Sequence, residues 1–186
     1  MAKHERFKVE GLAELAKALR ELPDRVAKNG LRVSVYAGAK DQQGYVDGVG
    51  GSARFHYPRG LALDSVGNVY VSEPNDNLIR KITPDGNVTT LAGSPSSGSA
   101  DGTGVASSFF QPNYLAVDGS GNIFVTDTNN QTLRRITPEG AVTTVAGLLD
   151  SPGSTDGAGS EARFYYPLGI AASAMGDIYV TSGETI

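Results

Sequence analysis

Three aspartates recur at a fixed spacing, each inside an Asp-Gly-x-Gly element. They are Asp47, Asp101 and Asp156, and they lie 54 and 55 residues apart. Carboxylate oxygens are the ligands that hard cations prefer, so one hypothesis is a ring of carboxylates that holds Ca²⁺. The alternative is a glycine turn that is capped by its own aspartate. We favour the turn, because one carboxylate per loop supplies few ligands for calcium, and apart from this hypothesis we expect no cofactor.

A second group of polar and aromatic residues is a candidate for ligand binding. Two tyrosines directly precede a proline, two acidic residues occupy equivalent positions after an apolar run, and an asparagine follows each acid. The candidates are Tyr57, Tyr166, Glu73, Asp127, Asn75 and Asn129. Because the acids and amides recur in equivalent places, we interpret them as repeat residues rather than a unique catalytic set.

Short apolar runs of strand length must position these side chains. In the first repeat they are 60–64, 68–72, 78–82 and 88–93, and each is rich in β-branched or aromatic residues. Gly-Asn and Pro-Asp-Gly elements between them are typical of tight turns. These runs and turns therefore predict repeats at 39–93, 94–147 and 148–186. Residues 33–38 resemble the fourth run of a repeat, and this strand could close the last repeat.

Two larger patterns accompany the strands. Long Gly- and Ser-rich loops at 39–54, 94–108 and 148–163 contain the aspartates, and aromatic residues follow each loop. We expect most of these aromatics to pack between neighbouring sheets. The third strands carry the cation pairs Arg80-Lys81 and Arg134-Arg135, for which we expect one member to face solvent and the other to bridge to an adjacent sheet.

The fold class that follows is mainly β, a partial β-propeller of about three four-stranded blades. The residues that carry this prediction are FHYPRGLALDSVGNVYVSEPNDNLIRKITPDG and FQPNYLAVDGSGNIFVTDTNNQTLRRITPEG. They resemble the NHL-repeat family of propellers over roughly residues 33–186. The sequence departs from that pattern at Asn113-Tyr114 and at Ala172-Ser173, where we expect adjusted packing. The resemblance implies protein, peptide or sugar ligands.

Residues 1–32 form a separate segment. Leucines spaced by three and four residues predict an amphipathic helix over 11–22, before Pro23. The stretch FKVEGLAELAKALRELPDRVAKNGLR resembles a phage tail-component family found at head–tail junctions. That resemblance implies a structural role in tail or neck assembly and a virion-associated location. The alternative is a helix that caps the open edge of the blades.

Composition excludes several classes of partner. The net charge is −4, and the acidic excess falls on the blades, so we expect no nucleic-acid partner. The start lacks the apolar segment of a signal peptide, which indicates cytoplasmic synthesis, and no apolar run is long enough for a membrane span. Three blades are too few for a ring, so we expect a homo-oligomer that completes the propeller, or a fragment or fusion.

These observations predict a non-enzymatic binding or interaction module. The alternative is a metal-dependent hydrolase or lyase, which are activities found on similar scaffolds. A zinc site of several histidines is hard to build, because the chain has only His4 and His56 and no cysteine. We therefore expect no enzyme.

Overall fold

The computed structural model describes residues 34–173 and 175–183. The chain divides into a short unit, Met1–Val35, and a larger unit, Tyr36–Ile186, which contains every strand below. The helix predicted within residues 1–32 lies outside the described residues. Among the described residues, no helix is long and apolar enough to cross a membrane.

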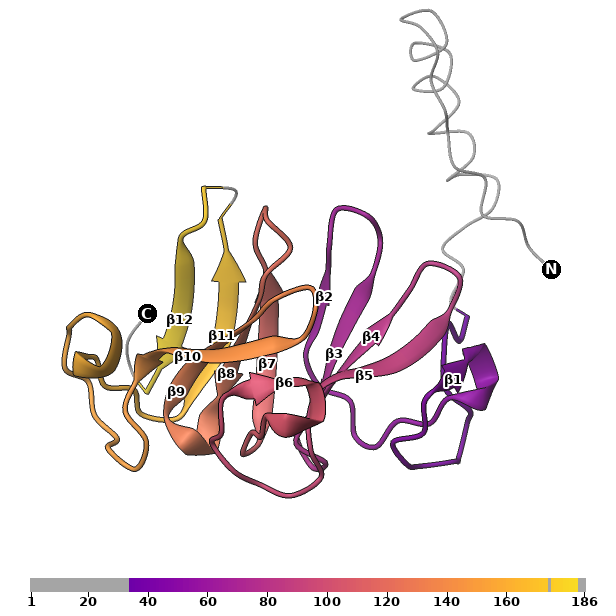
Figure 1. The fold of residues 1–186 in the computed structure, drawn as a ribbon, viewed down its shortest axis with the longest axis horizontal. Helices are drawn as coiled ribbons and strands as arrows, with labels where there is room; N and C mark the ends of the chain where they lie inside the picture. Colours follow the sequence, from indigo (N-terminus) through magenta and orange to yellow (C-terminus); the bar gives the residue numbers. More distant parts are fainter. Residues whose placement is uncertain (1–33, 174, 184–186) are drawn as a thin grey trace, which may run out of the picture. The chain divides into compact units, whose positions relative to one another are not determined.

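The first two repeats each fold into a five-stranded antiparallel sheet, and the third contributes a two-stranded hairpin (Figure 1). Sheet 1 has the order β1-β5-β4-β3-β2 and contains β1 (Gly48–Val49), β2 (Leu61–Leu63), β3 (Val69–Glu73), β4 (Leu78–Ile82) and β5 (Asn87–Gly93). Sheet 2 has the order β6-β10-β9-β8-β7 and contains β6 (Gly102–Thr103), β7 (Pro112–Val117), β8 (Ile123–Asp127), β9 (Thr132–Ile136) and β10 (Ala141–Gly147). Sheet 3 pairs β11 (Pro167–Ala172) with β12 (Ile178–Ser182).

Sheets 1 and 2 pack face to face through a shared apolar core. Tyr70 and Ile79 from sheet 1 lie against Leu115 and Val125 from sheet 2, and all four side chains are buried. Successive side chains of a strand point to opposite faces, so each sheet buries one face against each neighbour. Strands β7 and β8 in turn contact β11. The predicted fold, antiparallel blades of a partial propeller, is confirmed.

Two features of the sheets differ from the sequence prediction. Residues 34–38 do not form the expected strand. The strand at 33–38 was expected to close the last repeat, whereas Gly38 is held within the first one by a backbone hydrogen bond of 3.0 Å from its N–H to the carbonyl of Gly50. The second difference is β1 itself and its copy β6, which add a fifth strand to each complete sheet.

Similar hydrogen bonds close the hairpin between the first two strands of each repeat. Asp64 accepts hydrogen bonds from the backbone N–H groups of Val66 and Asn68, at 3.0 and 2.8 Å. Asp118 does the same in the second repeat. In the third repeat Ser173 takes this place, and its hydroxyl oxygen accepts from the N–H of Asp177 at 3.0 Å. The departure from the family pattern at this position therefore keeps the turn.

Candidate functional site

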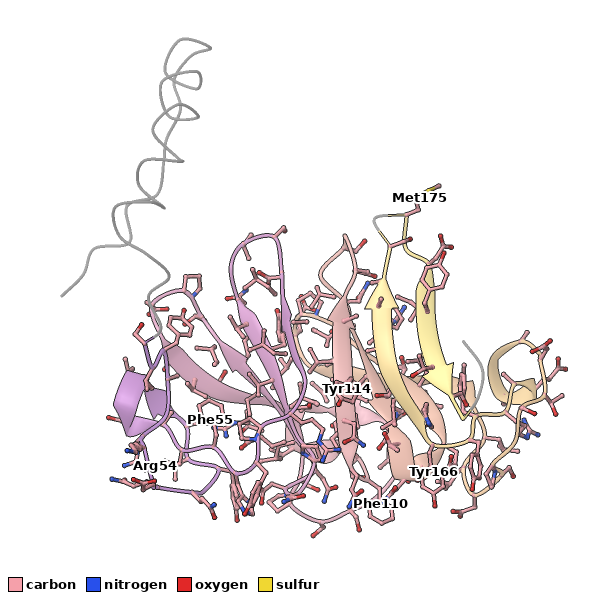
Figure 2. All side chains as sticks on the ribbon, turned by 180° about the vertical axis from the view of Figure 1, so that it is seen from behind. Arg54, Phe55, Phe110, Tyr114, Tyr166 and Met175 are labelled. Carbon is pink, nitrogen blue, oxygen red and sulfur yellow. The ribbon has the colours of Figure 1, made fainter. Side chains whose placement is uncertain are left out.

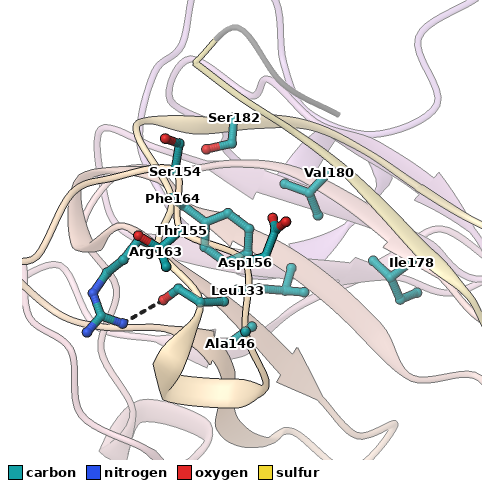
Figure 3. Close-up of a pocket in the computed structure, with 12 residues that line it drawn as sticks. Leu133, Ala146, Ser154, Thr155, Asp156, Arg163, Phe164, Ile178, Val180 and Ser182 are labelled. Carbon is teal, nitrogen blue, oxygen red and sulfur yellow. Dashed lines mark hydrogen bonds between the residues drawn. The ribbon is translucent and has the colours of Figure 1, made fainter.

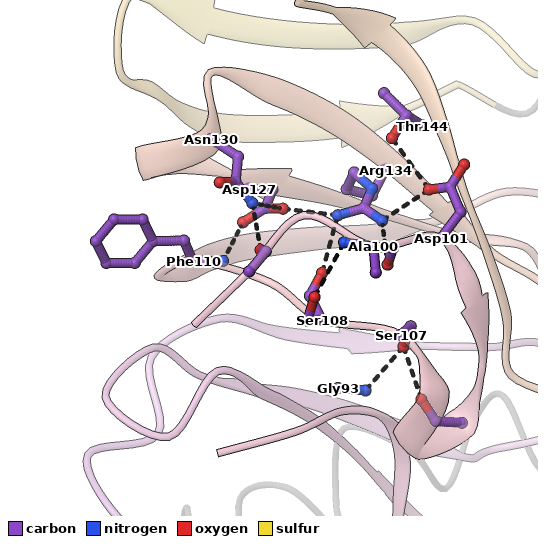
Figure 4. A network of polar contacts seen from close by, with 12 residues as sticks. Gly93, Ala100, Asp101, Ser107, Ser108, Phe110, Asp127, Asn130, Arg134 and Thr144 are labelled. Atoms are coloured by element: carbon purple, nitrogen blue, oxygen red, sulfur yellow. Dashed lines mark hydrogen bonds and ion pairs between the residues drawn. The ribbon is translucent and has the colours of Figure 1, made fainter. Parts of the chain in front are cut away.

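A fully buried arginine organises each complete sheet, and Figure 4 shows the arginine of sheet 2. Arg134 donates from Nη1 to Asp127 at 2.9 Å and from Nη2 to Asp101 at 2.8 Å. It also donates to the carbonyls of Ser108 and Ala100. The guanidinium thus ties the end of β8 to the Asp-Gly-x-Gly loop that precedes the sheet.

The first repeat has the same arrangement. Arg80 donates to Glu73 at 2.6 Å and to Asp47 at 2.7 Å, and its guanidinium lies 5.2 Å from the centre of the Phe55 ring. Because β1 belongs to the same sheet, the arginine closes its own blade. The expectation that it bridges to an adjacent blade is wrong. The second cation, Lys81, is half-buried and lies 5.8 Å from the Tyr70 ring centre.

The three aspartates of the first hypothesis have different surroundings. Asp47 and Asp101 are partners of the buried arginines, and each is about half exposed. Asp156 is exposed and lines a cavity between sheets 2 and 3. Within residues 34–173 and 175–183, no three acidic or histidine side chains lie close enough together to hold a metal ion. Asp47 and Asp101 serve the blades through ion pairs, and calcium binding by the three aspartates stays an untested hypothesis.

The two predicted acids after the second strand are structural partners as well. Glu73 and Asp127 are fully buried. Burial raises the pKa of Asp127 to about 6, against the lowering effect of the hydrogen bonds from Asn130 and the Phe110 N–H and of the Arg134 charge. Burial likewise raises the pKa of Glu73. Glu73 accepts hydrogen bonds from Arg80 and the His56 N–H, and Asp127 accepts them from the groups just named. Both carboxylates are therefore engaged within the blade.

The asparagines that follow lie at the surface. Asn75 is exposed, and Asn129 is half-buried with its backbone N–H bonded to the carbonyl of Phe110 at 3.1 Å. The hydrogen bonds recorded for the two carboxylates come from other residues: His56 and Arg80 for Glu73, and Phe110, Asn130 and Arg134 for Asp127.

Aromatic side chains project where each repeat enters its first strand, at the edge where Figure 2 labels Phe110 and Tyr166. We call this segment the rim: His56-Tyr57, Phe110-Gln111 and Tyr165-Tyr166. The exposed fractions are 62% for Tyr57, 40% for Phe110, 53% for Tyr165 and 49% for Tyr166. The expectation that these rings pack between sheets is wrong for the four rim aromatics. It is right for Phe109, which is fully buried.

In the second and third repeats, the turn of the preceding sheet holds the backbone of the rim. Tyr57, Gln111 and Tyr166 share a left-handed backbone, with φ of 51°, 55° and 49°. This conformation is costly for residues other than glycine and persists only where neighbours fix it. The side-chain oxygen of Asn77 accepts the N–H of Gln111 at 2.9 Å, and that of Gln131 accepts the N–H of Tyr166 at 2.7 Å.

A shallow pocket adjoins the rim in the first repeat. Tyr45, His56 and Asp76 line it together with Gln43 and Gly44. The His56 Nδ1 atom lies 2.9 Å from an Asp76 carboxylate oxygen. Sequence reasoning missed this pair. The signal was the place where the repeat is broken, since phenylalanine and asparagine stand at the equivalent positions of the second repeat.

Comparisons with known proteins agree with this architecture. No family model matches the chain. A 91-residue stretch, 48% of the chain, is 34% identical to Protein SUPPRESSOR OF QUENCHING 1, chloroplastic, from Arabidopsis thaliana, of which it covers 9%. The chain therefore spans only a small part of that relative.

Solved structures with propeller-like folds are also similar. A Bacteroides thetaiotaomicron protein of unknown function is 33% identical over 69% of this chain, with a TM-score of 0.63. An auxiliary nutrient binding protein from Bacteroides ovatus is 24% identical over 70% of this chain, with a TM-score of 0.56, and shows the fold alone. The chain covers 33% and 35% of those two chains.

Proposed function

We propose that the chain is a non-enzymatic binding module whose rim takes a protein, peptide or glycan ligand. The observation that carries this proposal is the set of exposed aromatic side chains on a fixed backbone. Aromatic rings offer a large contact area with few torsions to immobilise, which suits recognition. The shallow pocket beside the rim adds polar groups that would orient the ligand.

The left-handed backbone at Tyr57 and Tyr166 does not itself require a tyrosine side chain. Gln111 adopts the same left-handed conformation in the second repeat with a polar side chain. Large exposed rings at Tyr57 and Tyr166 therefore need another explanation, and ligand stacking supplies one. The acids that would otherwise suggest catalysis, Glu73 and Asp127, support the non-enzymatic choice because their oxygens are engaged with arginines.

The test begins with screening of the purified chain on peptide and glycan arrays, followed by titration calorimetry with the ligands found. We expect Tyr57→Ala and Tyr166→Ala each to weaken binding by about 10- to 30-fold, the size of a typical hot-spot truncation. The matched control is Tyr36→Ala, a tyrosine that is 44% exposed and lies outside the rim. Equal affinity for the two rim variants and the parent chain would contradict the proposal.

A second candidate function has one observation in its favour. The hydrogen-bonded pair of His56 and Asp76 at a pocket is an arrangement that can move protons, as a hydrolase or lyase requires. A ligand identified on the arrays should be recovered unchanged after long incubation if the chain only binds. Its conversion by the parent chain, together with loss of conversion in His56→Gln, would favour the enzyme.

Three narrower proposals accompany the binding role. The first is that the repeats belong to the NHL type, because their motif resembles that of the NHL family. Two copies associate, which light scattering would detect as about twice the 19.4 kDa mass of one chain. A phage setting rests only on residues outside those that the structure describes, and electron microscopy of particles with and without the chain would test it.

A further inference from the structure

The shallow pocket beside the rim, with a volume of about 300 Å³, combines a largely buried acid with an exposed aromatic ring. Its lining includes Tyr45, His56 and Asp76. The Asp76 side chain is 12% exposed, and its carboxylate is turned toward His56, whose Nδ1 atom lies 2.9 Å away. Tyr45 is 50% exposed. The second repeat shows what this arrangement replaces.

The backbone around the pocket is the same in the first two repeats. The N–H of Gly44 donates to the carbonyl of Phe55 at 3.3 Å, and the N–H of Gly98 donates to the carbonyl of Phe109 at 2.9 Å. The loops that follow β3 and β8 both end at a left-handed residue, with φ of 55° and 57°. Side chains at equivalent positions can therefore be compared directly.

An asparagine amide joins two acceptors at this place in the second repeat. The Nδ2 group of Asn130 donates to the carbonyl of Gly98 and to the carboxylate of Asp127, each at 2.7 Å. Asp76 is the equivalent residue of the first repeat, and an ionised carboxylate has no hydrogen to donate. Among the described residues, no hydrogen bond to the carbonyl of Gly44 is recorded. The first repeat therefore lacks the donor that its copy has.

The same substitution places a second negative charge near a buried acid. Burial raises the pKa of Glu73, and the charge of Asp76 raises it further, against the lowering effect of the hydrogen bonds from the His56 N–H and Arg80. The Arg80 guanidinium is already shared between Glu73 and Asp47. An added cation beside Asp76 would therefore relieve repulsion between the two acids.

The described part of the chain does not itself supply that cation, since no lysine or arginine lines the pocket. Arg54 packs beside Gly44, but its guanidinium donates to the carbonyls of Gly51 and Ala53, each at 2.7 Å. The described residues also contain no group of three acidic or histidine side chains that could hold a metal ion. An organic cation from a ligand fits these acceptors better than a metal ion does.

The aromatic residues at the pocket are suited to the same ligand group. Ser99 and Ser154 stand at the positions equivalent to Tyr45, and Figure 3 shows the short Ser154 side chain in the third repeat. His56 lies against Tyr57, with ring centres 4.9 Å apart. Aromatic faces attract cations, and they cover the apolar stem of a lysine side chain.

We propose that this pocket binds the primary ammonium group of a lysine side chain in a peptide ligand. The ammonium group occupies the place that corresponds to the Asn130 amide and donates to the Asp76 carboxylate and the Gly44 carbonyl. The lysine stem lies along Tyr45. An ammonium group suits acceptors in separate directions better than a planar guanidinium does. The inference rests on the proposed binding function of the rim and assigns a ligand class to it.

The probe is the N-acetyl methylamide derivative of lysine, added to the isotope-labelled full chain. The readout is the change in the NMR shifts of the Gly44, Tyr45 and His56 amides. We expect saturable shifts with this probe. The norleucine derivative, which has an apolar side chain and no ammonium group, should bind about tenfold or more weakly, because the charge-assisted hydrogen bond is absent.

Asp76→Asn is the variant that tests the acid, because it restores the asparagine of the second repeat. Its amide can donate to the Gly44 carbonyl, so we expect thermal unfolding to show no loss of stability. The variant should bind the lysine derivative about tenfold or more weakly than the parent chain. The matched control is Asp150→Asn, at an exposed loop position, which should bind as the parent chain does.

Three outcomes would overturn the inference. The first is equal binding of the lysine and norleucine derivatives by the parent chain, which needs no variant. The second is unchanged affinity in Asp76→Asn. The third is tighter binding of methyl glucosaminide, which carries its ammonium group on a sugar.

Failure of the proposed function would look different. In that case Tyr57→Ala and Tyr166→Ala would bind the ligand found on the arrays as tightly as the parent chain does. A ligand that depends on these tyrosines but not on Asp76 would support the binding function and refute the lysine site.

Discussion

Replacing Arg134 with methionine tests the claim that a buried cation holds each blade to the loop before it. The substitution keeps an unbranched, apolar side chain over Phe109 but removes every hydrogen bond of the guanidinium. It leaves Asp127 fully buried without its cation. Breaking a buried pair in this way costs about 3–5 kcal/mol of unfolding free energy. The pair with Asp101, which is 51% exposed, adds at most about 1 kcal/mol.

The expected loss is large enough to measure by urea unfolding followed by circular dichroism. For a domain of this size, it corresponds to a fall in Tm of about 6–20 °C. Arg135→Met is the matched control, since its side chain is only half-buried and no ion pair is recorded for it among the described residues. Arg134→Met combined with Asp127→Asn should be more stable than Arg134→Met alone, because the unpaired charge is gone.

The pH dependence has a defined sign. Loss of the cation raises the pKa of Asp127 further above its value of about 6. A carboxyl whose pKa is raised by folding binds its proton more tightly in the folded state, so Arg134→Met should lose less stability at pH 5 than at pH 8. Equal costs for Arg134→Met and Arg135→Met, or a double variant less stable than the single one, would refute the reasoning.

Two further predictions concern the turns. Burial alone would raise the pKa of Asp118, but hydrogen bonds from Asn122, Ser120 and Gly121 lower it below 3.8. Its stabilisation is therefore present above pH 4 and lost as pH falls through the lowered pKa. Asp118→Ser should flatten the acid limb of the stability curve measured by fluorescence or circular dichroism. Gly147 has a φ of 88°, and a Cβ added there would meet the carbonyl oxygen of Gln131. Gly147→Ala should therefore lower the unfolding free energy, measured in urea, by about 2 kcal/mol or more. Gly104→Ala should lower it less, because the added Cβ meets nothing within 4 Å.

Local patterns in the sequence predict the repeats and most strands well. The alternation of apolar residues and the Gly-Asn and Pro-Asp-Gly turns locate β4 at its observed bounds, Leu78–Ile82. The equivalent of the apolar run 60–64 in the second repeat is 114–118, but strand β7 begins earlier, at Pro112, because this residue pairs with Asp127 across an irregularity in the ladder. Such pairing is set by the neighbouring strand and leaves no alternating pattern.

The parts that the sequence did not predict depend on partners far along the chain. Strand β6 consists of Gly102 and Thr103, which carry no strand signal and are extended only because β10 binds them. From the sequence alone, Asp101 is interpreted as a turn residue, because its ion-pair partner Arg134 lies 33 residues later in the chain. The repeated spacing of aspartate and arginine was visible, but one sequence does not show that the two side chains meet.

Exposure of the rim aromatics was also beyond a one-dimensional pattern. Phe109 and Phe110 are adjacent and chemically identical, yet one is fully buried and the other is 40% exposed. Gln111, which follows them, has a left-handed backbone that turns the chain, whereas Tyr57 and Tyr166 occupy that left-handed position themselves. Two of the predicted candidates, Tyr57 and Tyr166, therefore lie at the surface for a reason that hydrophobicity does not reveal.

The ion pair between Asp47 and Arg80 has a consequence for synthesis on the ribosome. The arginine is translated 33 residues after the aspartate, which at about 5–20 residues per second is a delay of about 2–7 s. The loop therefore emerges from the ribosome before its cation, and before the strand β5 that pairs with β1. Each blade can therefore close only after its last strand has followed its leading loop out of the ribosome.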